Sequence, residues 1–97
     1  MPDFILLMRG DFDGPEPGWP DYLAKLRAAG CFRGGSAIGP GVALNKSGAR
    51  EPLDREIVGF IRIEAADLAE AQTYLAGNPV YEAGGTVEVR SLPFDDA

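Results

Sequence analysis

Residues 57–71, IVGFIRIEAADLAEA, predict a strand that leads directly into a helix. Side chains alternate between the two faces of a strand. One face of residues 57–64 is therefore entirely apolar, with Ile57, Gly59, Ile61 and Ile63. The opposite face combines apolar and charged side chains, namely Val58, Phe60, Arg62 and Glu64. A strand of this kind covers a core with one face and presents a mixed surface with the other.

The helix start that follows has its own signal. Asp67, with Glu70 three residues later, matches the spacing of a capping box in which Asp replaces Ser or Thr. The apolar stripe of this helix is expected to consist of Leu68, Ala71 and Leu75. The Gly-Asn-Pro sequence at residues 77–79 is expected to end the helix.

The remaining elements are predicted from the same patterns. The apolar run 4–8 suits a central strand buried on both faces, and residues 20–29 have helical spacing between Pro20 and Gly30. Residues 31–44 are rich in glycine, which indicates one interrupted strand or two short ones with a bulge or tight bends. A polar loop, 45–54, precedes the strand at 57–64, and a loop after residue 79 leads to a final strand, 86–92.

The predicted order is β-α-β-β-α-β, which is an α+β, ferredoxin-like arrangement with both helices on one face of the sheet. At 97 residues the chain has the size of one domain, residues 1–97. The uncovered sheet face would expose Val58 and Phe60, so a second copy is expected to cover it. Glu88 and Arg90 of the final strand lie on the same face as Arg62 and would line a cleft between the two sheets of a homodimer.

Composition excludes several partners. The net charge of −6 opposes binding to nucleic acid and to anionic membrane surfaces. No apolar stretch approaches the length of a membrane span, and residues 1–10 lack the basic start and cleavage site of a signal peptide. With a single cysteine, Cys31, no internal disulfide can form, which favours a reducing, cytoplasmic location.

Several stretches are similar to the YCII-related family, also described as YciI-like or DGPF-domain proteins. These are the first strand FILLM, the segment LAKLRAAG, and the long C-terminal run VGFIRIEAADLAEAQTYLAGNPVYEAGGTVEVRSLP, in which EVR is the most specific part. The resemblance covers essentially the whole chain. It implies a ferredoxin-like subunit that dimerises as an α/β barrel, a cleft that holds the candidate active site, and a function that is mostly unassigned.

The sequence departs from this family in two respects. Enzymatic proposals for the family rest on a His–Asp pair in some members, and this chain contains no histidine. The Asp-Gly-Pro-Phe signature before the third strand is missing. The only Asp-Gly-Pro sequence, at residues 13–15, lies in the first loop instead.

Arg9, Arg62 and Arg90 are the candidate ligand-binding residues, because the planar guanidinium suits a carboxylate or another small anion. The alternative is that these arginines pair with Glu64 and Glu88 and hold a dimer together. Trp19 is a further candidate at the mouth of a pocket, and its alternative is a place in the core.

Asp11 and Glu88 are the candidate catalytic residues, with Glu64 as a third acid. A carboxylate can act as a general acid or base if burial raises its pKa toward neutrality, whereas nearby arginines act in the opposite direction. The alternative is that they are surface or structural carboxylates. Cys31 is expected to be a small buried apolar residue. Without histidine, no zinc or other soft-ligand metal site is expected, and no cofactor is predicted.

Two functions are consistent with these residues. In the first, the protein binds a small anionic or aromatic-acid ligand in the dimer-facing cleft, and acid–base chemistry of the lyase or isomerase type is an option. In the second, it is a non-catalytic homodimer that acts as an interaction or regulatory module. The sequence does not decide whether the protein is an enzyme.

Overall fold

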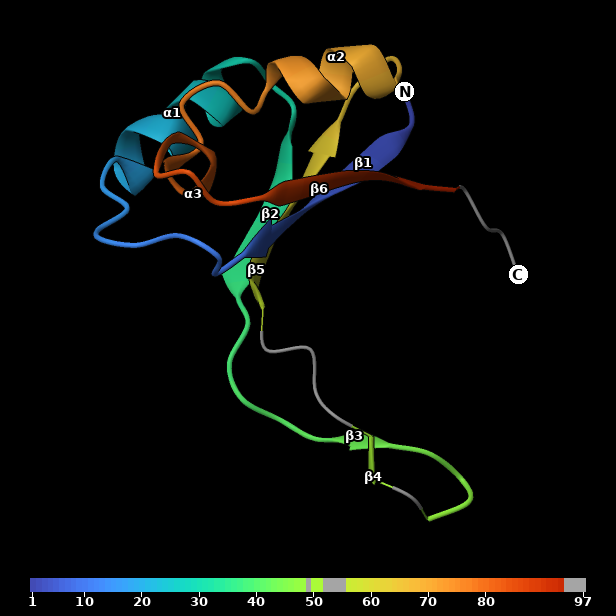
Figure 1. The fold of residues 1–97 in the computed structure, drawn as a ribbon. Coiled ribbons are helices and arrows are strands. Elements are labelled where there is room, and N and C mark those ends of the chain that lie inside the picture. The colour runs from blue at the N-terminus through green and yellow to red at the C-terminus, as the bar shows by residue number, and fades with distance from the viewer. Residues whose placement is uncertain (49, 52–55, 94–97) are drawn as a thin grey trace.

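The computed structural model describes residues 1–48, 50–51 and 56–93. Its main feature is a four-stranded sheet in the order β2-β5-β1-β6, in which all neighbouring strands are antiparallel. The helices lie together over one face of this sheet (Figure 1). The strands are β1 (Asp3–Arg9), β2 (Phe32–Ala37), β5 (Ile57–Glu64) and β6 (Val87–Leu92). This arrangement confirms the predicted α+β, ferredoxin-like fold.

The first helix, α1 (Trp19–Ala28), begins and ends within one residue of the predicted bounds. Gly18 precedes it with a φ of 99°, a conformation that favours glycine, and Pro20 occupies the first turn, where it costs no hydrogen bond. Tyr22 and Leu26 are buried against the sheet. The predicted helical face is therefore the face that packs.

The glycine-rich segment forms two short strands, which is one of the two predicted alternatives. The first is β2, whose pairing with β5 shifts between Phe32 and Gly35, and the second is β3 (Ala43–Leu44). The strand β3 pairs with β4 (Arg50–Glu51) in a small hairpin that projects away from the main sheet (Figure 1). The segment 45–54 was expected to be a loop throughout, and β4 corrects this; residues 49 and 52–54 lie outside the described part of the chain.

The second helix, α2 (Leu68–Thr73), starts as predicted. Asp67 caps it by accepting a hydrogen bond from the Glu70 amide at 2.8 Å, and the Glu70 carboxylate accepts one from the Ala66 amide at 2.9 Å. The predicted apolar stripe is wrong at Leu68, which is 46% exposed. The helix has only six residues, and its buried contact is centred on Ala71.

A short helix, α3 (Pro79–Glu82), occupies part of the predicted loop before the last strand. Asn78 caps it, since its side-chain oxygen accepts hydrogen bonds from the amides of Val80 and Tyr81 at 3.0 and 3.1 Å. Pro79 follows at the first helical position. The Asn-Pro pair that was expected only to end a helix therefore also begins one.

The core lies between the sheet and the helices. In β1, Phe4, Leu6 and Met8 are buried on the covered face, while Ile5 and Leu7 are half-buried on the other. The prediction that β1 is central is confirmed, but in the single chain it is fully buried on one face only. We call the second face, which no helix covers, the open face (Figure 1). None of the helices in the described part of the chain is both long enough and apolar enough to cross a membrane.

Candidate functional site

A pocket of about 290 Å³ lies on the covered side of the sheet, at the β2 edge. Small protein pockets that bind organic molecules are of this order of size and are mostly apolar. We call it the Trp19 pocket. Its lining consists of Met8, Glu16, Trp19, Leu23, Phe32, Gly35, Ser36, Ala37, Val58, Gly59, Phe60, Ile61 and Val80.

The pocket exists because small residues meet on the covered face of two neighbouring strands. The pairing of β2 with β5 places Ala37 opposite Gly59 and Gly35 opposite Ile61. The residues Gly35, Ala37 and Gly59 have too little side chain to fill the space beneath the start of α1. The floor is formed by glycine backbone: an added Cβ at Gly35 would lie 2.6 Å from the Phe60 carbonyl oxygen, and at Gly59 it would lie 3.1 Å from Met8 Cε and 3.2 Å from the Ser36 carbonyl oxygen.

The walls of the pocket come from three other elements. Trp19 and Leu23 belong to α1, Met8 to β1 and Val80 to α3. The Trp19 ring is braced by Tyr22, whose ring meets it edge-on with the centroids 6.0 Å apart. Trp19 was predicted to lie either at the mouth of a pocket or in the core. It is half-buried, packs against the core and also lines the pocket.

Asn78 ties two walls of the pocket together. It is fully buried, and its amide nitrogen Nδ2 lies 3.7 Å from Met8 Sδ as a donor, while its oxygen caps α3. Val80 follows two residues later in α3 and lines the pocket. A buried polar side chain is tolerated when its hydrogen-bonding groups are satisfied, and here they hold β1 and α3 in place.

The charged residues predicted for the site lie mainly on the open face. Arg9 donates from Nε and Nη2 to the same Glu88 oxygen, Oε2, at 3.2 and 2.6 Å. These interactions raise the pKa of the Arg9 guanidinium, with the Glu88 hydrogen bond as the largest cause. Arg9 also lies 3.6 Å from Glu56, and Arg90 Nη1 is 3.9 Å from the other oxygen of Glu88.

The other predicted arginine, Arg62, has a partner that was not foreseen. Its Nη2 donates to Asp3 Oδ2 at 3.0 Å, whereas Glu64 accepts from Arg33 at 2.6 Å. The role of these arginines in holding a dimer together stays a prediction, but their predicted pairing with a carboxylate is present for Glu88. The predicted pairing is wrong for Glu64, whose carboxylate pairs with Arg33, a residue in the irregular part of β2.

Asp11 lies just past the end of β1 and is bound to the start of β6. Its two oxygens accept from the Thr86 amide at 2.8 Å and from the Thr86 hydroxyl at 2.6 Å. These hydrogen bonds, the hydroxyl first, lower the pKa of the Asp11 carboxyl. The shift is opposite in direction to the one that prepares a carboxyl group to exchange protons near neutral pH.

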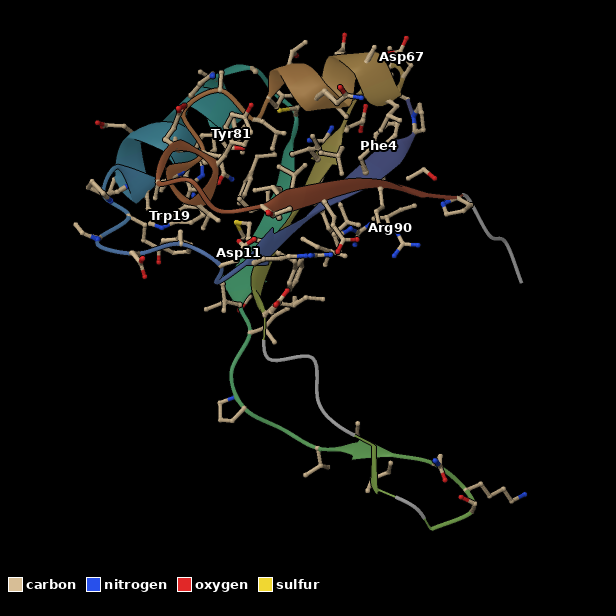
Figure 2. The ribbon with its side chains drawn as sticks, viewed as in Figure 1. Phe4, Asp11, Trp19, Asp67, Tyr81 and Arg90 are labelled. Atoms are coloured by element: carbon tan, nitrogen blue, oxygen red, sulfur yellow. The ribbon has the colours of Figure 1, made fainter. Side chains whose placement is uncertain are left out.

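The six predicted site residues therefore fall into separate groups. Arg9, Glu88 and Arg90 meet on the open face, and Arg62 lies on that face with Asp3. Asp11 lies at the turn into β6, and Trp19 lines the pocket under α1 (Figure 2). Their catalytic and ligand-binding roles stay predictions, but these residues do not form one site within a single chain.

Sequence reasoning missed Glu16 and the small residues of the pocket floor. Gly35, Ala37 and Gly59 become neighbours only through the shifted register of β2, which glycine content alone did not specify. Glu16 stands three residues before Trp19, but Pro17 and Gly18 lie between them, and the sequence gives no signal that separates Glu16 from the other acids of this loop.

Neither a metal site nor a reactive thiol is evident in the described ranges. Residues 1–48, 50–51 and 56–93 contain no group of three or more His, Cys, Asp or Glu side chains that could hold a metal ion. Cys31 is buried, its Sγ lies 3.6 Å from the Leu26 carbonyl oxygen, and burial raises the pKa of its thiol. This agrees with the prediction of a small buried apolar residue.

Comparison with known proteins identifies the family. The sequence matches the YCII-related domain over residues 16–95. This chain belongs to the YCII-related family. No curated protein matches it.

A solved structure with a similar fold is 5-chloro-2-hydroxyhydroquinone dehydrochlorinase (TftG) from Burkholderia phenoliruptrix AC1100, in complex with 2,5-dihydroxybenzoquinone. The TM-score is 0.53, with 18% sequence identity over 95% of each chain. At this identity the similarity concerns the fold, and it supports the ferredoxin-like architecture of this YCII-related chain.

Proposed function

We propose that this YCII-related protein binds a small, flat, largely apolar molecule in the Trp19 pocket. The observation that carries the proposal is the pocket itself, about 290 Å³ in size and lined mainly by apolar side chains. When an apolar ligand displaces water from the walls of such a pocket, the burial of apolar surface stabilises the complex. A single aromatic ring is of suitable size, and Trp19 and Phe32 offer it aromatic neighbours.

The fold comparison supports a small, flat ring as the ligand. A protein with a similar fold was solved with 2,5-dihydroxybenzoquinone, which is a single flat ring with oxygen substituents. We also propose that the bound molecule undergoes an acid–base reaction of the lyase or isomerase type. For that step the pocket contributes one carboxylate, Glu16, because Asp11 and Glu88 are bound to other groups.

The test uses Trp19, the single tryptophan of the chain, as its reporter. The protein is titrated with 4-methylphenol while the Trp19 indole N–H cross-peak is followed by NMR. We expect a saturable shift that Ala37→Leu weakens by about tenfold, because the larger side chain occupies the floor of the pocket. Ala28→Leu is the matched control, since Ala28 is exposed on α1 and does not line the pocket.

Two results would contradict the proposal. One is a Trp19 cross-peak that does not move with this or any other monocyclic aromatic probe. The other is equal binding by wild-type protein, Ala37→Leu and Ala28→Leu, which would mean that the ligand sits outside the pocket.

We also propose that the open face packs against a second copy of the chain. The face has an apolar centre, to which β1 contributes Ile5 and Leu7. Val58 and Phe60 of β5 alternate with the covered residues Gly59 and Ile61, and both also border the Trp19 pocket at the β2 edge. The charges of the open face are balanced although the chain as a whole is acidic. Among the described residues, four cations pair with four anions. The cations are Arg9, Arg33, Arg62 and Arg90, and the anions are Asp3, Glu56, Glu64 and Glu88. A neutral face with an apolar centre is suited to self-association.

Light scattering or sedimentation measures the mass of the protein, which is 10.3 kDa for one chain. We expect twice this mass for the wild type and the single-chain mass for Leu7→Glu, which places a charge in the apolar centre. Leu44→Glu, on the exposed hairpin of β3 and β4, is the control and should keep the wild-type mass. If Leu44→Glu is monomeric and Leu7→Glu is dimeric, the interface lies at the hairpin and not at the open face. A monomeric wild type would refute the proposal.

A further inference from the structure

Glu16 is the one ionisable residue that lines the Trp19 pocket. It is half-buried, and no described residue pairs with its carboxylate. Most other carboxylates of the described chain have partners: arginine for Asp3, Glu64 and Glu88, and amide or hydroxyl groups for Asp11, Asp67 and Glu70. Asp13 and Asp21 also have no partner in the described part of the chain, but both are exposed to solvent.

An unpaired carboxylate at an apolar pocket has predictable preferences. It accepts hydrogen bonds but cannot donate any while ionised, and such charge-assisted bonds are stronger than neutral ones. The pocket lining contains no lysine or arginine to offset its charge. The Ser36 hydroxyl donates its hydrogen to the Ala37 carbonyl at 2.8 Å, so it too is left as an acceptor.

We propose that Glu16 makes the pocket selective for an aromatic molecule that carries a hydroxyl donor and no negative charge. The ligand hydroxyl donates to the Glu16 carboxylate while the ring packs between Trp19 and the floor of small residues. A ligand carboxylate at the same position is repelled. This inference rests on the proposed function of the pocket, and it reverses the expectation of an anionic ligand that the arginines had raised.

The experiment compares three probes of similar size and shape: 4-methylphenol, 4-methylanisole and 4-methylbenzoate. The first is an uncharged donor, the second is uncharged without a donor, and the third is an anion. Dissociation constants are measured from the Trp19 indole N–H cross-peak at neutral pH and low salt. We expect the phenol to bind about tenfold more tightly than the benzoate, a difference typical of one charge-assisted hydrogen bond near the surface.

The variant Glu16→Gln removes the charge and retains most of the side-chain volume. It should bring the phenol and benzoate constants to within about twofold of each other, since the repulsion is gone and the amide can donate to the benzoate. Asp13→Asn is the matched control, because Asp13 is exposed, belongs to the same loop and does not line the pocket. This control should retain the wild-type preference.

The outcomes separate this inference from the proposed function. If the benzoate binds the wild type as tightly as the phenol does, or if Glu16→Gln leaves their ratio unchanged, the role of Glu16 is overturned while the pocket stands. If 4-methylanisole binds as well as the phenol, the hydroxyl donor is not recognised and the inference also fails. If none of the three probes moves the Trp19 cross-peak, both the pocket and the inference are refuted.

Discussion

The two faces of the sheet are built from the same strands but differ in their side chains and packing. On the covered face, side chains are apolar and tightly packed, but three small residues leave a hollow under α1. On the open face, charged side chains surround an apolar centre and pair with each other across neighbouring strands. The difference teaches that the charged residues, which attract attention in the sequence, pair with each other, while the pocket lies where side chains are smallest.

The distribution of carboxylates sharpens this contrast. Glu88 and Glu64 on the open face receive arginine at 2.6 Å, whereas Glu16 at the pocket receives no described side chain. Exposed ion pairs stabilise proteins by little, because solvent and salt screen them. The pairs on the open face are better explained as a means of keeping that face neutral than as a source of stability.

The largest expected effect is a loss of stability when either of two neighbouring leucines, one on each face of the sheet, is replaced by alanine. Leu6 is fully buried on the covered face, and Leu7 is half-buried on the open face. We expect Leu6→Ala to lower the free energy of unfolding by about 3 kcal/mol, because it leaves a cavity in the core. Leu7→Ala should cost about 1 kcal/mol or less in the monomer, because less apolar surface is buried there. Urea denaturation at low protein concentration provides the measurement.

Raising the protein concentration makes the same pair of variants more informative. If a second copy covers the open face, the cost of Leu7→Ala grows with concentration, because dimerisation then contributes to stability. The cost of Leu6→Ala does not depend on concentration in this way. Equal losses for both variants at low concentration would show that the two faces are equally buried in one chain.

The smallest expected effect concerns Asp11, which lies at the turn into β6. Its pKa is lowered in the folded state by the Thr86 hydroxyl and amide, so its ionised form is stabilised by folding. This contribution is present above the unfolded value, about pH 4, and is lost as the pH falls through the lower folded value. Thr86→Val removes the hydroxyl donor and should raise the pKa of Asp11, whereas Thr86→Ser should preserve it.

An NMR titration of the Asp11 carboxyl carbon measures this shift directly. The stability advantage of the wild type over Asp11→Asn should fade in the same acidic range. An Asp11 pKa that is the same in wild type and Thr86→Val would show that the hydroxyl hydrogen bond is not made in solution.

Much of the fold could be predicted because local pattern and tertiary packing agree. In β5 the alternation of Ile61 and Ile63 with Arg62 specifies both the strand and its buried face. The start of α2 at Asp67 follows from capping chemistry that acts over three residues. The turn of α3 was missed because Asn-Pro was interpreted only as an end signal, although the same pair also suits a helix start.

The site was harder to predict because it depends on register. Whether Ala37 faces Gly59 or a larger residue is decided by the bulge between Phe32 and Gly35, and a shift of one residue would change the pocket floor. The partner of Arg62 likewise depends on how β1 and β5 align. Sequence patterns identify which face a side chain occupies, but they do not specify its neighbour on the next strand.

Asn78 is also protected against chemical ageing. Asparagine side chains commonly deamidate when the peptide nitrogen of the following residue attacks the carboxamide, and that nitrogen must lose its hydrogen. The residue after Asn78 is Pro79, whose nitrogen carries no hydrogen, so this route is closed. The carboxamide that holds β1 and α3 together at the wall of the pocket is therefore shielded from this route by the residue that follows it.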